Sequence, residues 1–379
     1  MKVPFLDLGA AHREIKAGVR RRLQRLFRDN DYILGRDVRD FESAFSRFTG
    51  ARFTVGVNSG TDALFLALRA FGIGPGDEVI VPVYTYIASA YAVTYTGATP
   101  VFVDIDPETY NIDADKLRGA VTRRTRAVMP VHLYGQCADM PAIRRLAKER
   151  RLVVLEDAAQ AHGACLKGRR AGTWGDAAAF SFYPTKNLGG VGDGGAVTTS
   201  DRSLAARVLK MRDYGRIARY EHDEIGYNSR LDTLQAVFLT EKLGRLDRWN
   251  AARRRVAALY RRLLEGTADV VLPREMPGAT HVYHIFAVRV PRRDLVLEGL
   301  KRAGIGAAVH YPVPLHLQKV YRSLGHKRGA FPEAEKAASQ ILCLPIHPHM
   351  TPAQVHCVVR ALKKLLASNT GRDASVGPF

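Results

Sequence analysis

The sequence predicts an α/β protein with a mostly parallel sheet, followed by a smaller α+β domain. Short apolar runs alternate with helix-length segments between residues 53 and 199, as in a sheet covered by helices on both faces. The chain has 379 residues, more than one hydrophobic core supports, and hydrophobic residues make up 46% of it. We therefore expect a large domain over residues 1–245 and a small domain over residues 246–379.

Seven uncharged or nearly uncharged runs are expected to form the large sheet. They lie at residues 53–58, 78–82, 100–103, 126–131, 152–156, 177–183 and 196–199. Helices are expected between them at residues 61–71, 85–96, 113–121 and 139–149. A long helix from about 233 to 264, with a hinge at 243–247, should lead to strands near 282–290 and 307–311. The polar end, residues 368–379, predicts a disordered tail.

One lysine lies just beyond the sixth of these strands. Pro184 ends the apolar run, and Lys186 follows it before a glycine loop at 189–195. Ligands of open α/β sheets bind beyond the carboxyl ends of the strands, so Lys186 is a candidate for chemistry, although a lone loop lysine is usually solvated. The glycine loop leads into a strand rather than a helix, which argues against a dinucleotide site.

A carboxylate ends the strand before it. Parallel pairing would bring Asp157 to the same rim of the sheet as Lys186. Pyridoxal phosphate needs both groups, because its aldehyde forms a Schiff base with a lysine and a carboxylate keeps its pyridine nitrogen protonated. Asp157 could instead cap a helix that begins at Ala158.

A strand-to-helix turn at residues 57–62 is a candidate phosphate site. Free N–H groups and the positive end of a helix dipole attract anions, and Gly60 allows a close approach of the backbone. Thr61 can add a hydroxyl. The alternative is an ordinary helix cap by Ser59 or Thr61.

Motifs along nearly the whole chain resemble the DegT/StrS family of nucleotide-sugar aminotransferases. They occur in the family's order at residues 57–64, 72–82, 130–136, 156–164, 181–189, 192–196 and 227–232, and continue at 310–318 and 344–348. Several linked motifs are far more specific than a single glycine pattern. The resemblance implies a fold-type I pyridoxal phosphate enzyme that works as a homodimer.

The resemblance also implies a role for each matching residue. Lys186 is expected to bind the cofactor aldehyde and Asp157 the pyridine nitrogen. The other expected cofactor contacts are Gly60, Thr61 and Ser181 at the phosphate, Gln160 at the ring hydroxyl, Tyr86 on the ring face, and Asn228 from the neighbouring subunit.

Tyr183, His310 and Tyr311 are the expected substrate contacts, and His132 and His162 are further pocket candidates. Alternatives remain open: Tyr86 as a core aromatic, Asn228 as a turn residue, and a core or turn role for His310 and Tyr311.

The implied reaction moves an amino group from L-glutamate to a keto nucleotide sugar. Residues 227–232 and 310–318 are most similar to enzymes that act at C-3 of a dTDP-linked 3-keto-6-deoxyhexose in deoxyaminosugar biosynthesis, while C-4 or UDP-linked substrates are alternatives. The family's dehydratases, which use the pyridoxamine form of the cofactor, carry histidine in place of Lys186. A non-catalytic regulator on the same fold would be expected to have lost Lys186 or Asp157.

The long segment at residues 212–230 predicts a contact between subunits. It is polar and rich in Tyr and Arg, which suits an arm lying on a partner better than an internal connection. A surface loop is the alternative.

Composition limits the remaining function classes. The chain has 57 basic and 37 acidic residues, a formal charge of +20, but the basic residues are spread out and no nucleic-acid-binding motif accompanies them. An anionic nucleotide sugar is the simpler partner. The four cysteines lack metal-site or disulfide spacing, so we expect no metal. The sequence shows no membrane span or signal-peptide core, so a cytoplasmic location is expected.

Overall fold

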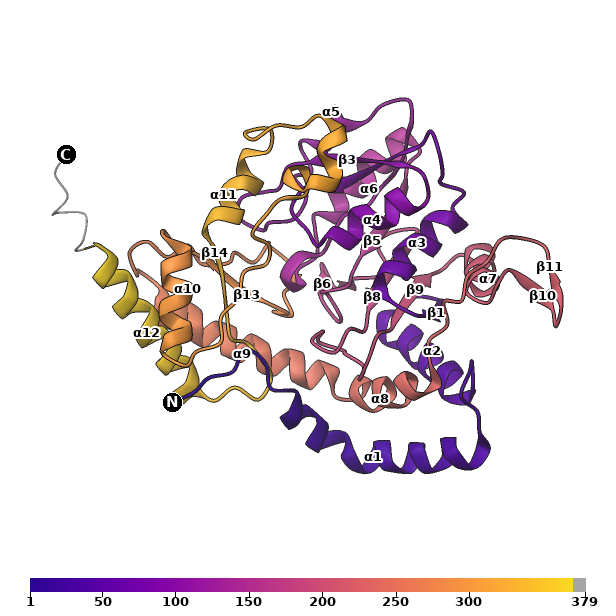
Figure 1. Cartoon of the computed structure of the whole chain (residues 1–379), viewed down its shortest axis with the longest axis horizontal. Coiled ribbons are helices and arrows are strands. Elements are labelled where there is room, and N and C mark those ends of the chain that lie inside the picture. The colour runs from indigo at the N-terminus through magenta and orange to yellow at the C-terminus, as the bar shows by residue number, and fades with distance from the viewer. Residues whose placement is uncertain (371–379) are drawn as a thin grey trace.

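The computed structural model describes residues 1–370, which form a large α/β body and a smaller C-terminal part (Figure 1). The expected disordered tail is wrong at residues 368–370, which end helix α12 (Pro352–Thr370). Ser368 donates its hydroxyl to the Lys364 carbonyl at 2.7 Å, a bond that serine makes within helices. Residues 371–379 of that tail lie outside the described residues. Within residues 1–370, the helices are all too short or too polar to cross a membrane.

A seven-stranded sheet forms the centre of the large body, and its strands coincide with the seven predicted ones. The strand order is β1-β9-β8-β5-β4-β2-β3. Strands β3, β2, β4, β5 and β8 run parallel, whereas β9 is antiparallel to both of its neighbours, so the prediction of a mostly parallel sheet is confirmed. In chain order the strands are β1 (Phe53–Val57), β2 (Glu78–Pro82), β3 (Thr99–Val103), β4 (Thr125–Val128), β5 (Val153–Asp157), β8 (Ala177–Ser181) and β9 (Gly195–Thr199).

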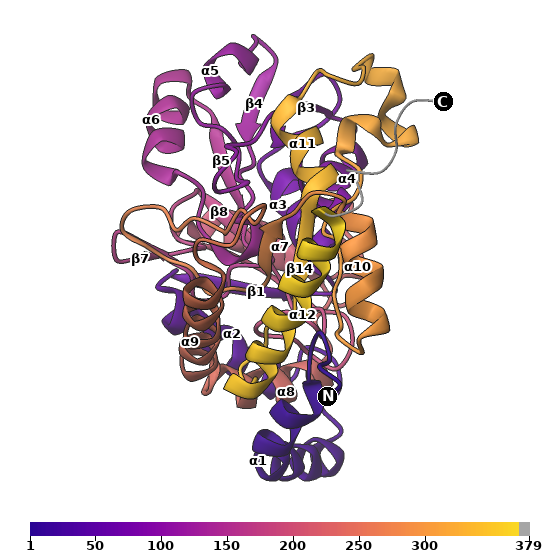
Figure 2. The same cartoon turned by 90° about the vertical axis from the view of Figure 1, so that its left-hand side faces the viewer.

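Helices cover both faces of this sheet (Figure 2). Alternate residues of a strand point to opposite faces, so Val79 and Val81 of β2 belong to one core cluster and Ile80 to the other. The first face is covered by α3 (Gly60–Ala70), α4 (Ile87–Tyr95) and α7 (Arg202–Met211). The second is covered by α2 (Arg36–Thr49), α6 (Met140–Arg150) and α8 (Thr233–Leu243), and α1 (Leu8–Asp29) packs on α8.

The helix expected at residues 113–121 is wrong for most of its length, because only α5 (Leu117–Ala120) is helical. The Asp113 N–H donates to the Asp104 carbonyl, and the Asp113 carboxylate accepts from the Asp115 N–H, both at 3.0 Å. Such local side-chain bonds hold a turn where the helix was expected to begin.

The long helix expected from 233 to 264 is two helices, α8 and α9 (Leu246–Leu264). Gly244 and Arg245 separate them, within the hinge expected at 243–247. Glycine is the weakest ordinary helix former, which accounts for a break at this position.

The C-terminal part has its own core. Its sheet pairs β13 (Phe286–Arg289) with β14 (Ile341–Leu344) and is accompanied by α10 (Arg293–Arg302), α11 (Pro332–Gln340) and α12. Val3 also packs in this core, although the expected boundary assigns it to the large domain. The division at residue 245 stays a prediction.

The strand expected near 307–311 is wrong, and β14 was missed. Of that segment, Ala308 alone pairs with the small sheet, through Cys343. The chain then turns toward the large body, where hydroxyl groups of Tyr84 and Tyr134 replace the sheet as hydrogen-bond partners.

The remaining elements are short. A three-stranded sheet contains β6 (Cys165–Leu166), β7 (Arg169–Arg170) and β12 (Ala279–Thr280), and a hairpin contains β10 (Arg216–Ala218) and β11 (Glu221–His222). Single 3-10 turns lie at Leu133–Gly135, Leu315–Leu317 and Lys319–Leu324.

Candidate active site

Lys186 lies in the turn that follows β8. Its N–H donates to the Tyr183 carbonyl at 2.9 Å. Burial lowers the pKa of the Lys186 ammonium group to about 8, and the Asp157 carboxylate opposes this change. The partial burial of Lys186, in a turn whose next residues 187–190 are buried, disfavours the alternative of an ordinary solvated loop lysine.

Side chains from α8 and α9 hold the loop that follows Lys186. Asn187 donates to Asn250 at 2.9 Å, and Gln235 accepts from the Val191 N–H at 2.8 Å. The buried ammonium group of Lys242 donates to the Gly189 carbonyl at 2.6 Å. Lys186 therefore extends from a firmly anchored turn.

Asp157 ends β5, the strand beside β8, and is 5% exposed. One carboxylate oxygen accepts from the Ser89 hydroxyl at 2.8 Å and the other from the Ala159 N–H at 3.1 Å. No helix follows within the described chain until Arg202, so the alternative of a helix cap is wrong and the Ala159 bond belongs to a turn.

Burial also shifts the pKa of Asp157. It raises the pKa of the carboxyl group, while the Ser89 hydroxyl, the Ala159 N–H and the Lys186 charge lower it. A cation placed against this carboxylate would stabilise its charged form. Buried groups with such shifted pKa values are typical of functional sites.

The N-terminus of α3 lies at the turn where the phosphate site is predicted. Ser59 accepts from the Asp62 N–H at 3.1 Å and is therefore the helix cap that was considered as an alternative. Thr61 is not the cap and lies in the first turn of the helix. A Cβ atom added to Gly60 would lie 2.6 Å from the Ser181 Cβ, so only glycine lets the end of β8 approach the helix. Gly60 at the start of α3 therefore lies against Ser181, at the end of the strand that leads to Lys186.

Three aromatic or amide residues lie on the Asp157 side of the site. Gln160 donates to the Tyr311 hydroxyl at 3.2 Å, and the Tyr311 ring centroid is 5.7 Å from that of Tyr86. Tyr86 is 56% exposed, which excludes the core alternative, and Tyr183 is 52% exposed. Both phenols are accessible to a ligand.

Three histidines surround Lys186, and one of them was missed. Burial lowers the pKa of His162 to about 3 and also lowers the pKa of His284 and His310. The Lys186 charge lowers all three pKa values further, so these imidazoles are neutral neighbours of the amine. His284 belongs to no motif that signals its role, and only the fold brings it to Lys186.

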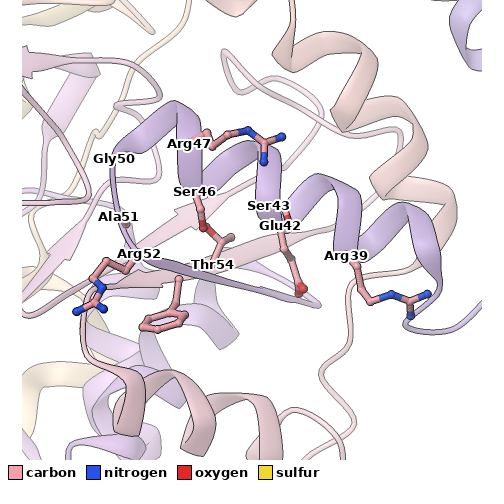
Figure 3. Close-up of a pocket in the computed structure, with 10 residues that line it drawn as sticks. Arg39, Glu42, Ser43, Ser46, Arg47, Gly50, Ala51, Arg52 and Thr54 are labelled. Atoms are coloured by element: carbon pink, nitrogen blue, oxygen red, sulfur yellow. The ribbon is translucent and has the colours of Figure 1, made fainter.

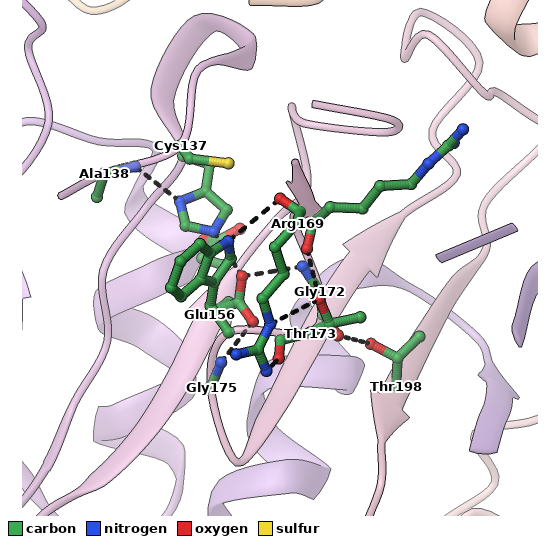
Figure 4. A network of polar contacts seen from close by, with 12 residues as sticks. Cys137, Ala138, Glu156, Arg169, Gly172, Thr173, Gly175 and Thr198 are labelled. Carbon is green, nitrogen blue, oxygen red and sulfur yellow. Dashed lines mark hydrogen bonds and ion pairs between the residues drawn. The ribbon is translucent and has the colours of Figure 1, made fainter. Parts of the chain in front are cut away.

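His132 belongs to the network of hydrogen bonds around Glu156, of which Figure 4 labels Glu156, Ala138, Gly172 and Gly175. Its Nδ1 accepts from the Ala138 N–H at 3.1 Å, so its Nε2 carries the proton and donates to Glu156 at 2.8 Å. Glu156 also accepts from the N–H groups of Gly172 and Gly175. Both ring nitrogens are occupied inside the core, which favours a structural role for His132 over a pocket role.

Asn228 is exposed at the base of the arm, residues 212–230. The arm contains the β10–β11 hairpin and projects from the body at the right of Figure 1. Tyr220 and Ile225 of the arm are 82% and 77% exposed. Apolar exposure of this extent is what a contact with a partner would cover.

A separate hollow lies away from the Lys186 site. It has a volume of about 650 Å³ and lies between α2 and β1. Arg39, Arg47 and Arg52 spread along it rather than converging (Figure 3). Without converging polar groups it does not compete with the Lys186 site.

The residues at the Lys186 site fit pyridoxal phosphate. A buried amine with a lowered pKa can react with an aldehyde, and a buried carboxylate gains from a cationic ring nitrogen. The first turn of α3 lies against Ser181, and the start of a helix is suited to bind a phosphate. Fold and site together define a fold-type I pyridoxal phosphate enzyme.

Comparison with known proteins gives the family. The model described as the DegT/DnrJ/EryC1/StrS aminotransferase family matches residues 13–363, and the chain belongs to this family. It is an aminotransferase whose cofactor is pyridoxal phosphate.

Three relatives show how far the similarity extends. The dTDP-3-amino-3,4,6-trideoxy-alpha-D-glucose transaminase of Streptomyces venezuelae is 48% identical over 363 residues, 96% of each protein. A pleiotropic regulatory protein of Geobacillus stearothermophilus is 47% identical over 364 residues, 96% of this chain and 98% of the relative. The crystal structure of S. venezuelae DesV superposes with a TM-score of 0.94 at 48% identity and covers 96% of this chain and 98% of DesV.

The lowered pKa of Lys186 predicts how cofactor capture depends on pH. Only the free amine attacks an aldehyde, so covalent uptake of pyridoxal phosphate by the apoenzyme should accelerate up to pH of about 8 and then level off. Stopped-flow absorbance of the apoenzyme at a series of pH values measures this rate. A rate that keeps rising toward the ordinary lysine pKa of 10.5 would contradict the burial of the amine.

Proposed function

We propose that this aminotransferase moves the amino group of L-glutamate to C-3 of a dTDP-linked 3-keto-6-deoxyhexose, in deoxyaminosugar biosynthesis. The observation that carries the reaction type is the pair of Lys186 and Asp157 at the ends of neighbouring strands. The sugar is supported by the S. venezuelae transaminase, whose name specifies a dTDP-linked 3-aminosugar. A purely regulatory role is disfavoured, because Lys186 and Asp157 are both retained.

Each group of the site has a proposed part in holding the cofactor. Asp157 would hold the protonated ring nitrogen, and Tyr86 would stack on the ring. Gly60, Thr61 and Ser181 would bind the phosphate, while Gln160 would contact the ring hydroxyl. When bound, pyridoxal phosphate supplies an aldehyde for amino exchange and a ring that withdraws electrons.

Lys186 is the proposed acid and base of both half-reactions. With a pKa of about 8, its amine can take a proton from the amino donor and return one to the sugar side at neutral pH. The pKa values of His162, His284 and His310 are lowered, so these rings do not compete with Lys186 for the proton. The cationic ring nitrogen of the bound cofactor would keep Asp157 anionic in both directions.

Tyr183, His310 and Tyr311 are proposed to bind the sugar. The exposed phenol of Tyr183 lies in the same turn as Lys186, and Tyr311 lies beside Tyr86. These phenols and the His310 imidazole would supply hydrogen-bonding groups to the sugar.

A panel of nucleotide sugars tests the proposed substrate. The pyridoxamine form of the enzyme is mixed with dTDP- and UDP-linked 3-keto and 4-keto sugars, and the return of the cofactor's aldehyde-form absorbance is followed. We expect the dTDP-linked 3-keto-6-deoxyhexose to react fastest. A faster reaction with a UDP-linked or 4-keto sugar would replace the proposed substrate, and no reaction with any sugar would reject the function.

A homodimer with shared sites is the proposed assembly. Asn228, on the exposed arm, would contact the cofactor phosphate of the partner subunit. The test mixes inactive Lys186→Ala protein with an Asn228→Trp variant and allows subunits to exchange. Heterodimers should regain activity, because both lesions can fall in one pocket. Activity no greater than the sum of the parents, after verified exchange, would reject the shared site.

A further inference from the structure

The segment that carries His310 and Tyr311 reaches the site from the C-terminal part of the chain. Beyond Ala308 it has left the small sheet, and a backbone bond from the Leu315 N–H to the Val83 carbonyl, 2.9 Å long, joins it to the large body. Between these two points, the backbone is held by side chains of the large body.

Two tyrosine hydroxyls hold the peptide between His310 and Tyr311. The Tyr84 hydroxyl accepts from the Tyr311 N–H at 2.9 Å and donates to the His310 carbonyl at 3.2 Å. The Tyr134 hydroxyl donates to the same carbonyl. The His310 carbonyl and the Tyr311 N–H are therefore both hydrogen-bonded to phenols. Tyr84 lies just beyond the end of β2, and Tyr134 lies in the turn after β4.

Burial keeps these phenols neutral and in place. Tyr84 is 1% exposed and Tyr134 is 3% exposed. Desolvation raises the pKa of both hydroxyls, so they remain donors throughout the working pH range. The His310 carbonyl is partly buried, so loss of a phenol donor would leave it less well satisfied.

The hydroxyl end of the Tyr311 side chain is linked to Tyr134 through Gln160. Gln160 donates to the Tyr311 hydroxyl at 3.2 Å and accepts from the Tyr134 N–H at 2.7 Å. The backbone and the hydroxyl of Tyr311 are therefore both tied to the large body. Since the Tyr311 ring lies 5.7 Å from that of Tyr86, this network sets where the ring stands in the site.

We infer that Tyr84 and Tyr134 are positioning residues that fix His310 and Tyr311 for the nucleotide sugar. They act through the backbone and touch no reacting atom. The inference rests on the proposed sugar-binding role of His310 and Tyr311. It predicts that loss of either hydroxyl affects the sugar half-reaction and leaves the L-glutamate half-reaction nearly unchanged.

Tyr84→Phe and Tyr134→Phe test this inference, with Tyr260→Phe as the matched control. Tyr260 is fully buried, and its hydroxyl donates to the Pro345 carbonyl at 3.0 Å, so the control loses the same kind of bond away from the site. All three variants should show similar decreases in Tm. The two site variants alone should bind the dTDP-linked 3-aminosugar product about tenfold more weakly or worse, because Tyr134→Phe loses one hydrogen bond to the segment and Tyr84→Phe loses two.

Hydrogen exchange of residues 308–317 in the holoenzyme provides a readout that needs no substrate. Exchange there should increase in Tyr84→Phe and Tyr134→Phe and stay at the wild-type rate in Tyr260→Phe. Unchanged exchange would overturn the inference, as would faster exchange with unchanged sugar kinetics or an equal slowing of both half-reactions. If wild-type enzyme accepted no keto sugar, the proposed function would fail, whereas the exchange data would still show whether the hydroxyls hold the segment.

Discussion

Replacing Lys186 by alanine is expected to lower turnover by roughly 10³-fold or more while the protein still folds. The reaction needs an amine that attacks the cofactor and then carries a proton, and alanine can do neither. The Lys186 side chain contributes to no core cluster, so the thermal transition should remain cooperative and near that of the wild type. Borohydride reduction followed by peptide mass spectrometry should find no pyridoxyl group attached to the variant.

An exposed lysine provides the control for this prediction. Lys148 lies in α6 on the protein surface, and Lys148→Ala should keep both turnover and labelling at Lys186. A pyridoxyl group found on another lysine of the wild-type protein would show that Lys186 is not the attachment point. Wild-type turnover by Lys186→Ala would remove it from the mechanism altogether.

The strand ends are the part of the site that the sequence predicts best. Asp157 and Lys186 each follow an apolar run, and parallel pairing of adjacent strands is enough to place them on one rim. Gly60 is equally predictable from the sequence, because a strand-to-helix turn with glycine is a local pattern. Local periodicity and the chemistry of one residue type are sufficient for these predictions.

The supporting groups could not be found in this way. Ser89, which donates to Asp157, and His284, which neighbours Lys186, lie far from them in sequence and belong to no chemical motif. Tyr84 and Tyr134 act on a backbone more than 170 residues away, with separations of 226 and 176 residues to His310. Only the folded chain brings such pairs together.

The wrong secondary-structure predictions have a similar cause. The segment at 307–311 has the composition of a strand, but beyond Ala308 the His310 carbonyl and the Tyr311 N–H bond to tyrosine hydroxyls instead of a sheet. At Asp113 a carboxylate bonds to the local backbone and replaces the first turn of a helix. In both places side-chain hydrogen bonds override the pattern of apolar residues.

Replacing Asp157 by asparagine is expected to slow both half-reactions by roughly 100-fold or more. Asparagine keeps the shape and can still accept from the Ala159 N–H, but it cannot stabilise a cationic ring nitrogen. Cofactor should still bind, and single-turnover absorbance measurements with L-glutamate and with the keto sugar give the two rates. The equal loss in both directions distinguishes this defect from a change at the sugar pocket.

Glu156→Gln is the matched control, because Glu156 is the adjacent residue of β5 and is also buried. Its carboxylate accepts from His132, Gly172 and Gly175 on the other face of the sheet, so the amide should lower the free energy of unfolding by about 1–3 kcal/mol. The folded fraction of this variant should nevertheless react at nearly the wild-type rate. If Asp157→Asn reacted as fast as Glu156→Gln, Asp157 would serve only to hold the turn at Ala159. A selective loss in Asp157→Asn would instead separate the electronic role of this carboxylate from the structural role of its neighbour.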